Sequence, residues 1–266
     1  MIAADDDSAT SYGFEISIDE AAYLVEYLDL TGLLPEVLAV FNPMTRPELA
    51  QDWKDYQHHR LTERGILTPT GALPEVATLM RTLAHAEETL AIRITPMHEE
   101  DTMLRVAIAR RFDSFVVASR TRHIFLVQPV PSSEWPDAAQ KVIDAQLGTA
   151  EPAPLAQTVQ LTIDDVKRAA QSPPGATTDI LIELGVPPGD AAILNAASKP
   201  DVYTEITAAR RYNGIVRRST TAVTILDTAR GRVMAWPHIG PDRSTWISYA
   251  AVSYTHLRAH ETPEHL

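Results

Sequence analysis

Alternation of apolar and polar residues predicts several short strands in the second part of the chain. Residues 202–209 (VYTEITAA) place successive side chains on opposite sides of an extended segment. Residues 220–226 are rich in β-branched side chains, and residues 227–231 (DTARG) supply a tight turn into a further strand at residues 232–236. Short strands joined by tight turns indicate antiparallel pairing.

An upstream segment shows the same order of elements. Residues 104–129 contain a strand with paired arginines, a turn, a β-branched strand, a basic turn and a closing apolar strand. The beginning is repeated too, because residues 15–20 (EISIDE) and 160–165 (QLTIDD) each predict a short strand that leads into a helix with an acidic first turn. We therefore predict two pseudo-symmetric halves, with residues 104–129 and 215–237 in equivalent places.

Apolar residues at helical spacing, with glycine and proline at the ends, predict the elements between these strands. The predicted helices cover residues 19–30, 47–65, 74–85, 138–147, 163–171, 178–184 and 190–197. The further strands cover residues 90–95, 103–110, 115–120 and 123–128. These elements indicate an α+β fold, mainly an antiparallel sheet with helical bundles.

Composition changes along the chain predict its organisation. Residues 1–12 are expected to be a disordered leader, followed by one domain at residues 13–251. Its halves span about residues 13–148 and 157–251, and the proline- and alanine-rich residues 149–156 are the linker between them.

The last residues differ from everything before them. Residues 252–266 (VSYTHLRAHETPEHL) hold three of the nine histidines, and most of this segment resembles the conceptual translation of a sequencing adapter. We expect an artefactual tail that makes few contacts with the body, in place of a native C-terminal end.

Overall composition excludes several functional classes. The 266 residues, 45% of them hydrophobic, are enough for a full core, and the absence of cysteine excludes disulfides, thiol nucleophiles and thiolate metal sites. No apolar run approaches the roughly 20 residues that cross a bilayer, so we predict a cytoplasmic protein without a membrane span. A net charge of −12 argues against a nucleic-acid partner.

The chain as a whole resembles the EspG family of type VII (ESX) secretion-associated proteins. The resemblance rests on residues 15–20, 61–83 and 160–165, and above all on residues 203–206 (YTEI) followed by 222–233 (AVTILDTARGRV). It covers about residues 14–250 and implies an EspG-like fold. It also implies a cytosolic chaperone, not an enzyme, which binds PE–PPE heterodimers at the helical tip of PPE. Such a chaperone keeps these pairs soluble and directs them to a type VII secretion system.

The resemblance further implies a partner-binding surface, made of a loop between two strands and one strand face of the second half. Its residues are Met97, His98, Glu99, Glu100, Asp101, Glu205, Thr207, Arg217, Ser219 and Thr221. From the residues alone, the polar run that begins at His98 is typical of a solvated hairpin loop, and a cation site is a rarer alternative. We expect no cofactor and no metal.

Two other functions stay open at this point. A hydrolase-like enzyme would gather His123, Asp227 and a serine such as Ser119 in a pocket between the halves. No G-x-S-x-G, Walker or H-E-x-x-H motif supports it. The other alternative is a structural dimer that uses its sheet edges for weak self-association.

Overall fold

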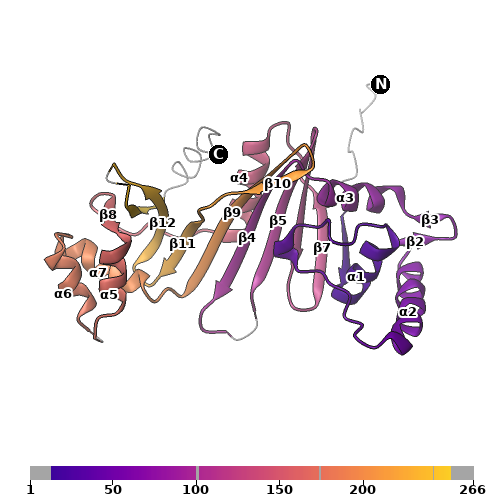
Figure 1. The fold of residues 1–266 in the computed structure, drawn as a ribbon, viewed down its shortest axis with the longest axis horizontal. Helices are drawn as coiled ribbons and strands as arrows, with labels where there is room; N and C mark the ends of the chain where they lie inside the picture. The colour runs from indigo at the N-terminus through magenta and orange to yellow at the C-terminus, as the bar shows by residue number, and fades with distance from the viewer. Residues whose placement is uncertain (1–12, 100–101, 174, 242, 253–266) are drawn as a thin grey trace, which may run out of the picture.

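The computed structural model describes residues 13–252, with the exception of residues 100, 101, 174 and 242. Most of its strands form one antiparallel eleven-stranded sheet along the length of the molecule, and helices gather at both ends (Figure 1). This arrangement confirms the predicted α+β class. The proposed leader at residues 1–12 and residues 253–266 of the proposed tail lie outside the described residues.

The first half contains every helix and strand that the sequence predicts there, with boundaries that differ by a few residues. In chain order these elements are β1 (Phe14–Ser17), α1 (Ile18–Tyr27), η1 (Glu36–Leu38), η2 (Pro47–Leu49), α2 (Ala50–Glu63), β2 (Leu67–Thr68), β3 (Gly71–Ala72), α3 (Pro74–Ala84), β4 (Glu88–Pro96), β5 (Leu104–Arg111), β6 (Ser114–Arg120), β7 (Ile124–Pro129) and α4 (Trp135–Leu147). The small β2–β3 hairpin was not predicted and forms a separate two-stranded sheet.

The second half contains one strand, β13, that was not predicted, and the strand expected at Arg217 is β10. Its elements are β8 (Val159–Thr162), α5 (Ile163–Ala170), α6 (Thr177–Glu183), α7 (Pro188–Ala197), β9 (Val202–Tyr212), β10 (Ile215–Arg218), β11 (Val223–Thr228), β12 (Gly231–Ile239) and β13 (Thr245–Ala251).

The strand order confirms two pseudo-symmetric halves. It runs β1-β7-β6-β5-β4 in the first half and β9-β11-β12-β13-β8 in the second, and β4 pairs with β9 in the middle. In that central pair Ile92 lies opposite Ile206. The predicted equivalence of residues 104–129 with 215–237 was wrong in its boundaries, because the equivalent strands of the second half extend through β13. The strand β13 matches β7, while β10 and β11 both pair with β9 and together match β5.

Both halves begin with the same capped strand-to-helix unit. The Ser17 hydroxyl accepts a hydrogen bond from the Glu20 backbone N–H at 3.1 Å, and the Glu20 carboxylate accepts from the Ser17 N–H at 2.7 Å. Thr162 caps α5 in the same way, through the Asp165 N–H at 3.1 Å. A short polar side chain that satisfies the first free N–H groups fixes where each helix starts, as the two sequence repeats predicted.

The two helical lobes lie on the same face of the sheet. Opposed residues of antiparallel strands share a face, which places Ala107, Ala91 and Thr207 on one face of β5, β4 and β9. The lobe of α1–α3 packs on that face at Ala107, and α7 packs on it at Leu226 of β11, opposite Tyr203. The other face of the central strands is covered by α4.

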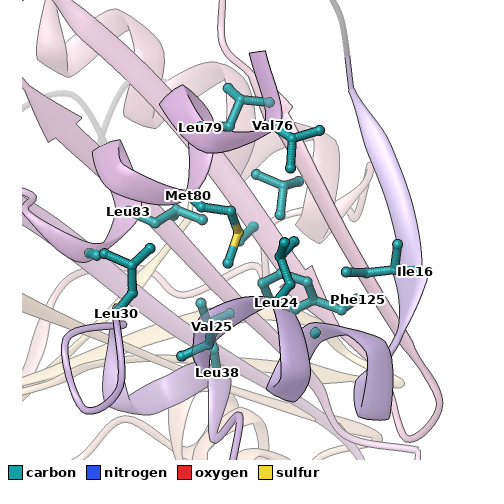
Figure 2. Packing of buried hydrophobic residues seen from close by; sticks show 14 of the residues in the cluster. Ile16, Leu24, Val25, Leu30, Leu38, Val76, Leu79, Met80, Leu83 and Phe125 are labelled. Carbon is teal, nitrogen blue, oxygen red and sulfur yellow. The ribbon is translucent and has the colours of Figure 1, made fainter. Parts of the chain in front are cut away.

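The first lobe has the larger core. Leu24 and Val25 of α1, Met80 and Leu83 of α3, and Phe125 of β7 interdigitate there (Figure 2). All five side chains are buried, and this burial stabilises the lobe by about 1.5–3 kcal/mol for each side chain.

The segment predicted as a linker packs against β12. The Ala153 N–H donates to the Arg232 carbonyl at 3.0 Å, and the Arg232 N–H donates to the Glu151 carbonyl at 2.8 Å. Ala153 is buried. Val252, which we assigned to the tail, is also buried, so the body extends at least one residue further than predicted.

Candidate partner-binding surface

The central strands leave one face of the sheet partly uncovered between the two helical lobes. We call this surface the open face and define it by Arg93 of β4, Tyr203, Glu205 and Thr207 of β9, and Thr224 of β11. Cross-strand pairing puts Arg93 opposite Glu205, and Glu205 opposite Thr224, in one row. None of these five residues is fully buried, and Tyr203 is 37% exposed. The open face is therefore polar at its centre and accessible.

An ion pair organises the centre of the open face. Arg93 Nη1 lies 3.3 Å from Glu205 Oε2, and the two side chains are 37% and 31% exposed. Because Glu205 is partnered, replacing it would also unbalance Arg93 and the neighbouring Arg105, which lies opposite Arg93 on β5. A charge reversal at Glu205 should therefore lower the stability of the fold.

Two further arginines tie the first lobe to this row. Arg105 donates to the Val37 carbonyl at 3.5 Å, and Arg120, its neighbour on β6, donates to the Leu38 carbonyl at 2.9 Å. Burial, reinforced by the charge of Arg105, lowers the pKa of Arg120 below its ordinary value. These contacts hold the η1 segment over the edge of the open face.

The structure divides the predicted binding residues into two groups. Met97 is 54% exposed in the β4–β5 loop, and the adjacent His98 Nε2 lies 3.2 Å from Asp201 Oδ1; Glu99 in the same loop is exposed. Tyr203 lies opposite Thr95, one residue pair away from the end of the β4–β9 pairing that is next to this loop. Of the ten predicted residues, Glu100 and Asp101 lie outside the described part of the chain.

The second group lies toward the opposite end of β9, and it does not share one face as predicted. Arg217 lies opposite Arg210, whereas Arg218 lies opposite Ala209 and pairs with Glu36 of the first lobe. Adjacent strand residues point to opposite faces, so Arg217 points away from the open face. The distance along β9 from the loop to Arg217 is about 27 Å at the usual rise of about 3.4 Å per residue.

A hollow next to the open face was not predicted. A cavity of about 340 Å³ lies between residues 32–37 of the first lobe and the strands β4, β9 and β10. Thr207 and Ser219 line this cavity, while Thr221 is exposed in the segment between β10 and β11. In the sequence, only the apolar residues 33–41 indicated that this lobe packs against another segment. They did not indicate that β10 forms the opposite wall of the cavity.

The sequence model of the EspG family matches residues 17–260. The chain belongs to the EspG family. The ESX-1 secretion-associated protein EspG1 of Mycolicibacterium smegmatis is 28% identical over 228 residues, which are 85% of this chain and 77% of that protein. The ESX-3 secretion-associated protein EspG3 of the same species is 27% identical over 237 residues, 88% of this chain and 79% of that protein.

A solved structure of the EspG family has the same fold. It is Mycobacterium tuberculosis EspG5, a type VII secretion system chaperone in complex with a PE25–PPE41 dimer. The likeness has a TM-score of 0.75 at 19% identity and covers 93% of this chain and 94% of that one. The predicted family and the predicted fold are therefore confirmed.

The hydrolase alternative does not fit this EspG-family protein. Ser119 lies on β6 and Asp227 on β11, four strand positions apart, which is about 19 Å at the usual strand spacing of about 4.8 Å. Asp227 is also held by Arg232, with Nε–Oδ1 and Nη2–Oδ2 distances of 2.5 and 2.9 Å. His123 is exposed in the turn between β6 and β7. It therefore lies next to β6, which carries Ser119, and not next to β11, which carries Asp227.

Two features of this EspG-family protein concern metal binding and membrane spans. The described residues contain no group of three or more histidine or acidic side chains arranged to hold a metal ion. Within the same residues, no helix is long and apolar enough to cross a membrane. The central strands present a partly exposed sheet face between two helical lobes.

Proposed function

We propose that this protein is a cytosolic chaperone for PE–PPE heterodimers. It binds the helical tip of the PPE partner, keeps the pair soluble and directs it to a type VII secretion system. The observation that carries this proposal is the match to the EspG family along nearly the whole chain, with the fold of a chaperone solved on a PE–PPE dimer.

The open face has the properties that such a reversible contact needs. An exposed apolar helical tip is an aggregation hazard, and a partner that covers it must offer apolar contacts without being itself an apolar patch. Met97 and Tyr203 supply large, partly exposed apolar side chains at one end of the open face. The ion-paired Arg93 and Glu205 lie beside them, and polar groups of this kind favour specificity and fast association.

We place the PPE contact on the loop end of the open face. The footprint would combine Met97 to Glu99 with Tyr203, Glu205 and Thr207, which share one face or lie at its edge. Arg217 falls outside this footprint because it points to the opposite face.

Binding of purified PE–PPE heterodimers tests the proposal. Titration calorimetry and size measurement should show a complex with at least one pair from the native actinobacterial host. Absence of binding to every PE–PPE pair of that host would reject the chaperone function itself, whatever the contact residues are.

The variant Glu205→Arg tests the location of the contact. It places a second positive charge opposite Arg93, so we expect unfolding to become about 1–2 kcal/mol easier. If the position is desolvated in the complex, affinity should fall by about 2–5 kcal/mol.

The double variant Arg93→Glu, Glu205→Arg is the matched control. It restores the ion pair with its charges exchanged, so stability should return close to that of the wild type. If the PE–PPE heterodimer contacts these two charges directly, its affinity for the double variant should stay low. Wild-type affinity in both variants would remove Glu205 from the contact.

A further inference from the structure

The β9–β10 hairpin lies outside the PPE contact proposed above. It lies at the end of the sheet away from the β4–β5 loop (Figure 1). Its two-residue turn, Asn213–Gly214, has φ values of 49° and 78°. Positive φ at both positions is the conformation of the tight turns that match the twist of a hairpin, so the hairpin is well defined.

One edge of β10 is unpaired. Among the strands of the described chain, β10 pairs only with β9. The sheet continues from β9 to β11 and then to β12, so it does not include a further neighbour of β10. The turn closes at the pair Tyr212–Ile215, and the Ser219 N–H donates to the Ala208 carbonyl at 2.8 Å. Since alternate residues of an edge strand bond to its neighbour, the N–H and C=O groups of Val216 and Arg218 point outward.

Large apolar side chains are exposed around this edge. Tyr212, Ile215 and Val216 of the hairpin are 70%, 64% and 40% exposed, and Phe112 in the β5–β6 turn is 67% exposed. Phe112 lies at the same end of the sheet, because Arg110 and Arg210 both lie opposite Glu88. An apolar patch beside an unpaired strand edge is a typical place for a protein contact.

The charge of the hairpin is opposite to that of the protein. It carries four arginines, whereas the chain has a net charge of −12. Arg210 pairs with Glu88, Arg218 pairs with Glu36, and Arg211 donates to the carbonyls of Ala84 and Ala86. Among the described residues of the hairpin, Arg217 is the exposed arginine left to meet a partner. The β4–β5 loop at the other end of the central strands carries Glu99 instead, next to Asp201. A partner that fits the hairpin is therefore acidic.

We propose that the β10 edge binds an extended acidic segment of a partner protein, which adds to the sheet as a further strand. The outward N–H and C=O groups of Val216 and Arg218 would pair with its backbone, and Arg217 would contact its carboxylates. Tyr212, Ile215 and Phe112 would take up its apolar side chains. A second copy of this chain fits worse, because two such edges would bring like-charged arginines together.

This site is separate from the proposed PPE contact. The hairpin and the β4–β5 loop are at opposite ends of the central strands, about 27 Å apart along β9. Both sites are therefore free to be occupied at once, and each is tested without the other.

The probe is a fluorescein-labelled peptide in which glutamate alternates with valine. We expect fluorescence anisotropy to show binding that weakens as salt is raised, and NMR to show shifts of the Val216 and Arg218 amide signals. Two matched peptides are controls: one is methylated at alternate backbone nitrogens, which removes its edge donors, and one carries lysine in place of glutamate. Both should bind about tenfold more weakly or worse.

Two variants test the residues. Arg217→Glu places a carboxylate opposite Arg210, which keeps the hairpin stable, and Val216→Pro removes an outward N–H that β9 does not use. Each should weaken binding of the glutamate peptide by about tenfold or more, while PE–PPE affinity stays unchanged. Arg230→Glu, an exposed charge in the β11–β12 turn, is the control and should leave peptide binding unchanged.

Three results would overturn the proposal. The first is equal binding of the methylated or lysine peptide. The second is an unaltered affinity of Arg217→Glu for the glutamate peptide. The third is self-association of the protein without peptide that Arg217→Glu abolishes, which would assign the edge to a second copy.

Discussion

Arg232 joins the two halves, and its replacement should have a large effect on stability. Its side chain is only 7% exposed and forms a two-point ion pair with Asp227, at 2.5 and 2.9 Å. The same guanidinium donates to the carbonyls of Leu147 and Gly148 at the end of α4, at 2.9 and 3.2 Å. One side chain therefore holds β12, β11 and the last turn of α4 together.

Arg232→Ala leaves these acceptors without their donor. Breaking a buried pair by removing one partner costs about 3–5 kcal/mol, and Asp227, at 24% side-chain exposure, retains some contact with water. We therefore expect the lower end, about 3 kcal/mol. For a protein of this size that corresponds to a fall of about 6–12 °C in the thermal midpoint.

Urea and thermal unfolding of three variants measure this effect. Asp227→Asn keeps a hydrogen-bond acceptor and should cost less than Arg232→Ala. Arg230→Ala, in the exposed turn two residues earlier, should stay within about 0.5 kcal/mol of the wild type. A loss below about 1 kcal/mol for Arg232→Ala would show that this pair does not join the halves.

Two further predictions concern positions with unusual surroundings. Gly231 has a φ of 105°, and a Cβ there would lie 2.7 Å from the Ala153 Cα, so Gly231→Ala should lower the free energy of unfolding by about 2 kcal/mol or more in urea titrations. Burial, then the charges of Arg111, Arg211 and Arg81, lower the pKa of His85 from its ordinary value of 6.5. The unfolded chain then takes up a proton first, so stability should fall as the pH drops below about 6.5, and less so in His85→Gln. Equal pH dependence of both proteins would contradict this.

Much of the local structure was predictable because its causes are local. The strand-to-helix units at Ser17 and Thr162 follow from a capping side chain three residues before an acidic one. The turn at residues 227–231 follows from its glycine, and the structure places Thr228 opposite Gly231. The strand β13 was missed, because its sequence TWISYAA has apolar residues on both faces and lacks the alternation of a half-buried strand.

The position of the candidate site was not predictable in the same way. Alternation shows which residues of one strand share a face, but not which strand lies beside it or which face a helix covers. The choice of Glu205 depended on its own strand and stays a prediction, whereas its ion-pair partner Arg93 lies 112 residues away in the sequence. Arg217 was assigned to the same face as Glu205, and the register of β10 on β9 puts it on the other.

The α-helices, most strands, the approximate two-fold repeat and, through the resemblance, the EspG family were predictable from the residues. The pairing of β4 with β9 was not, and this pairing joins the halves into one sheet and separates the loop at Met97 from the hairpin at Arg217. Local preferences differ from strand pairing because they depend on a few neighbouring residues. Strand pairing and face coverage instead depend on backbone hydrogen bonds and packing between segments about a hundred residues apart.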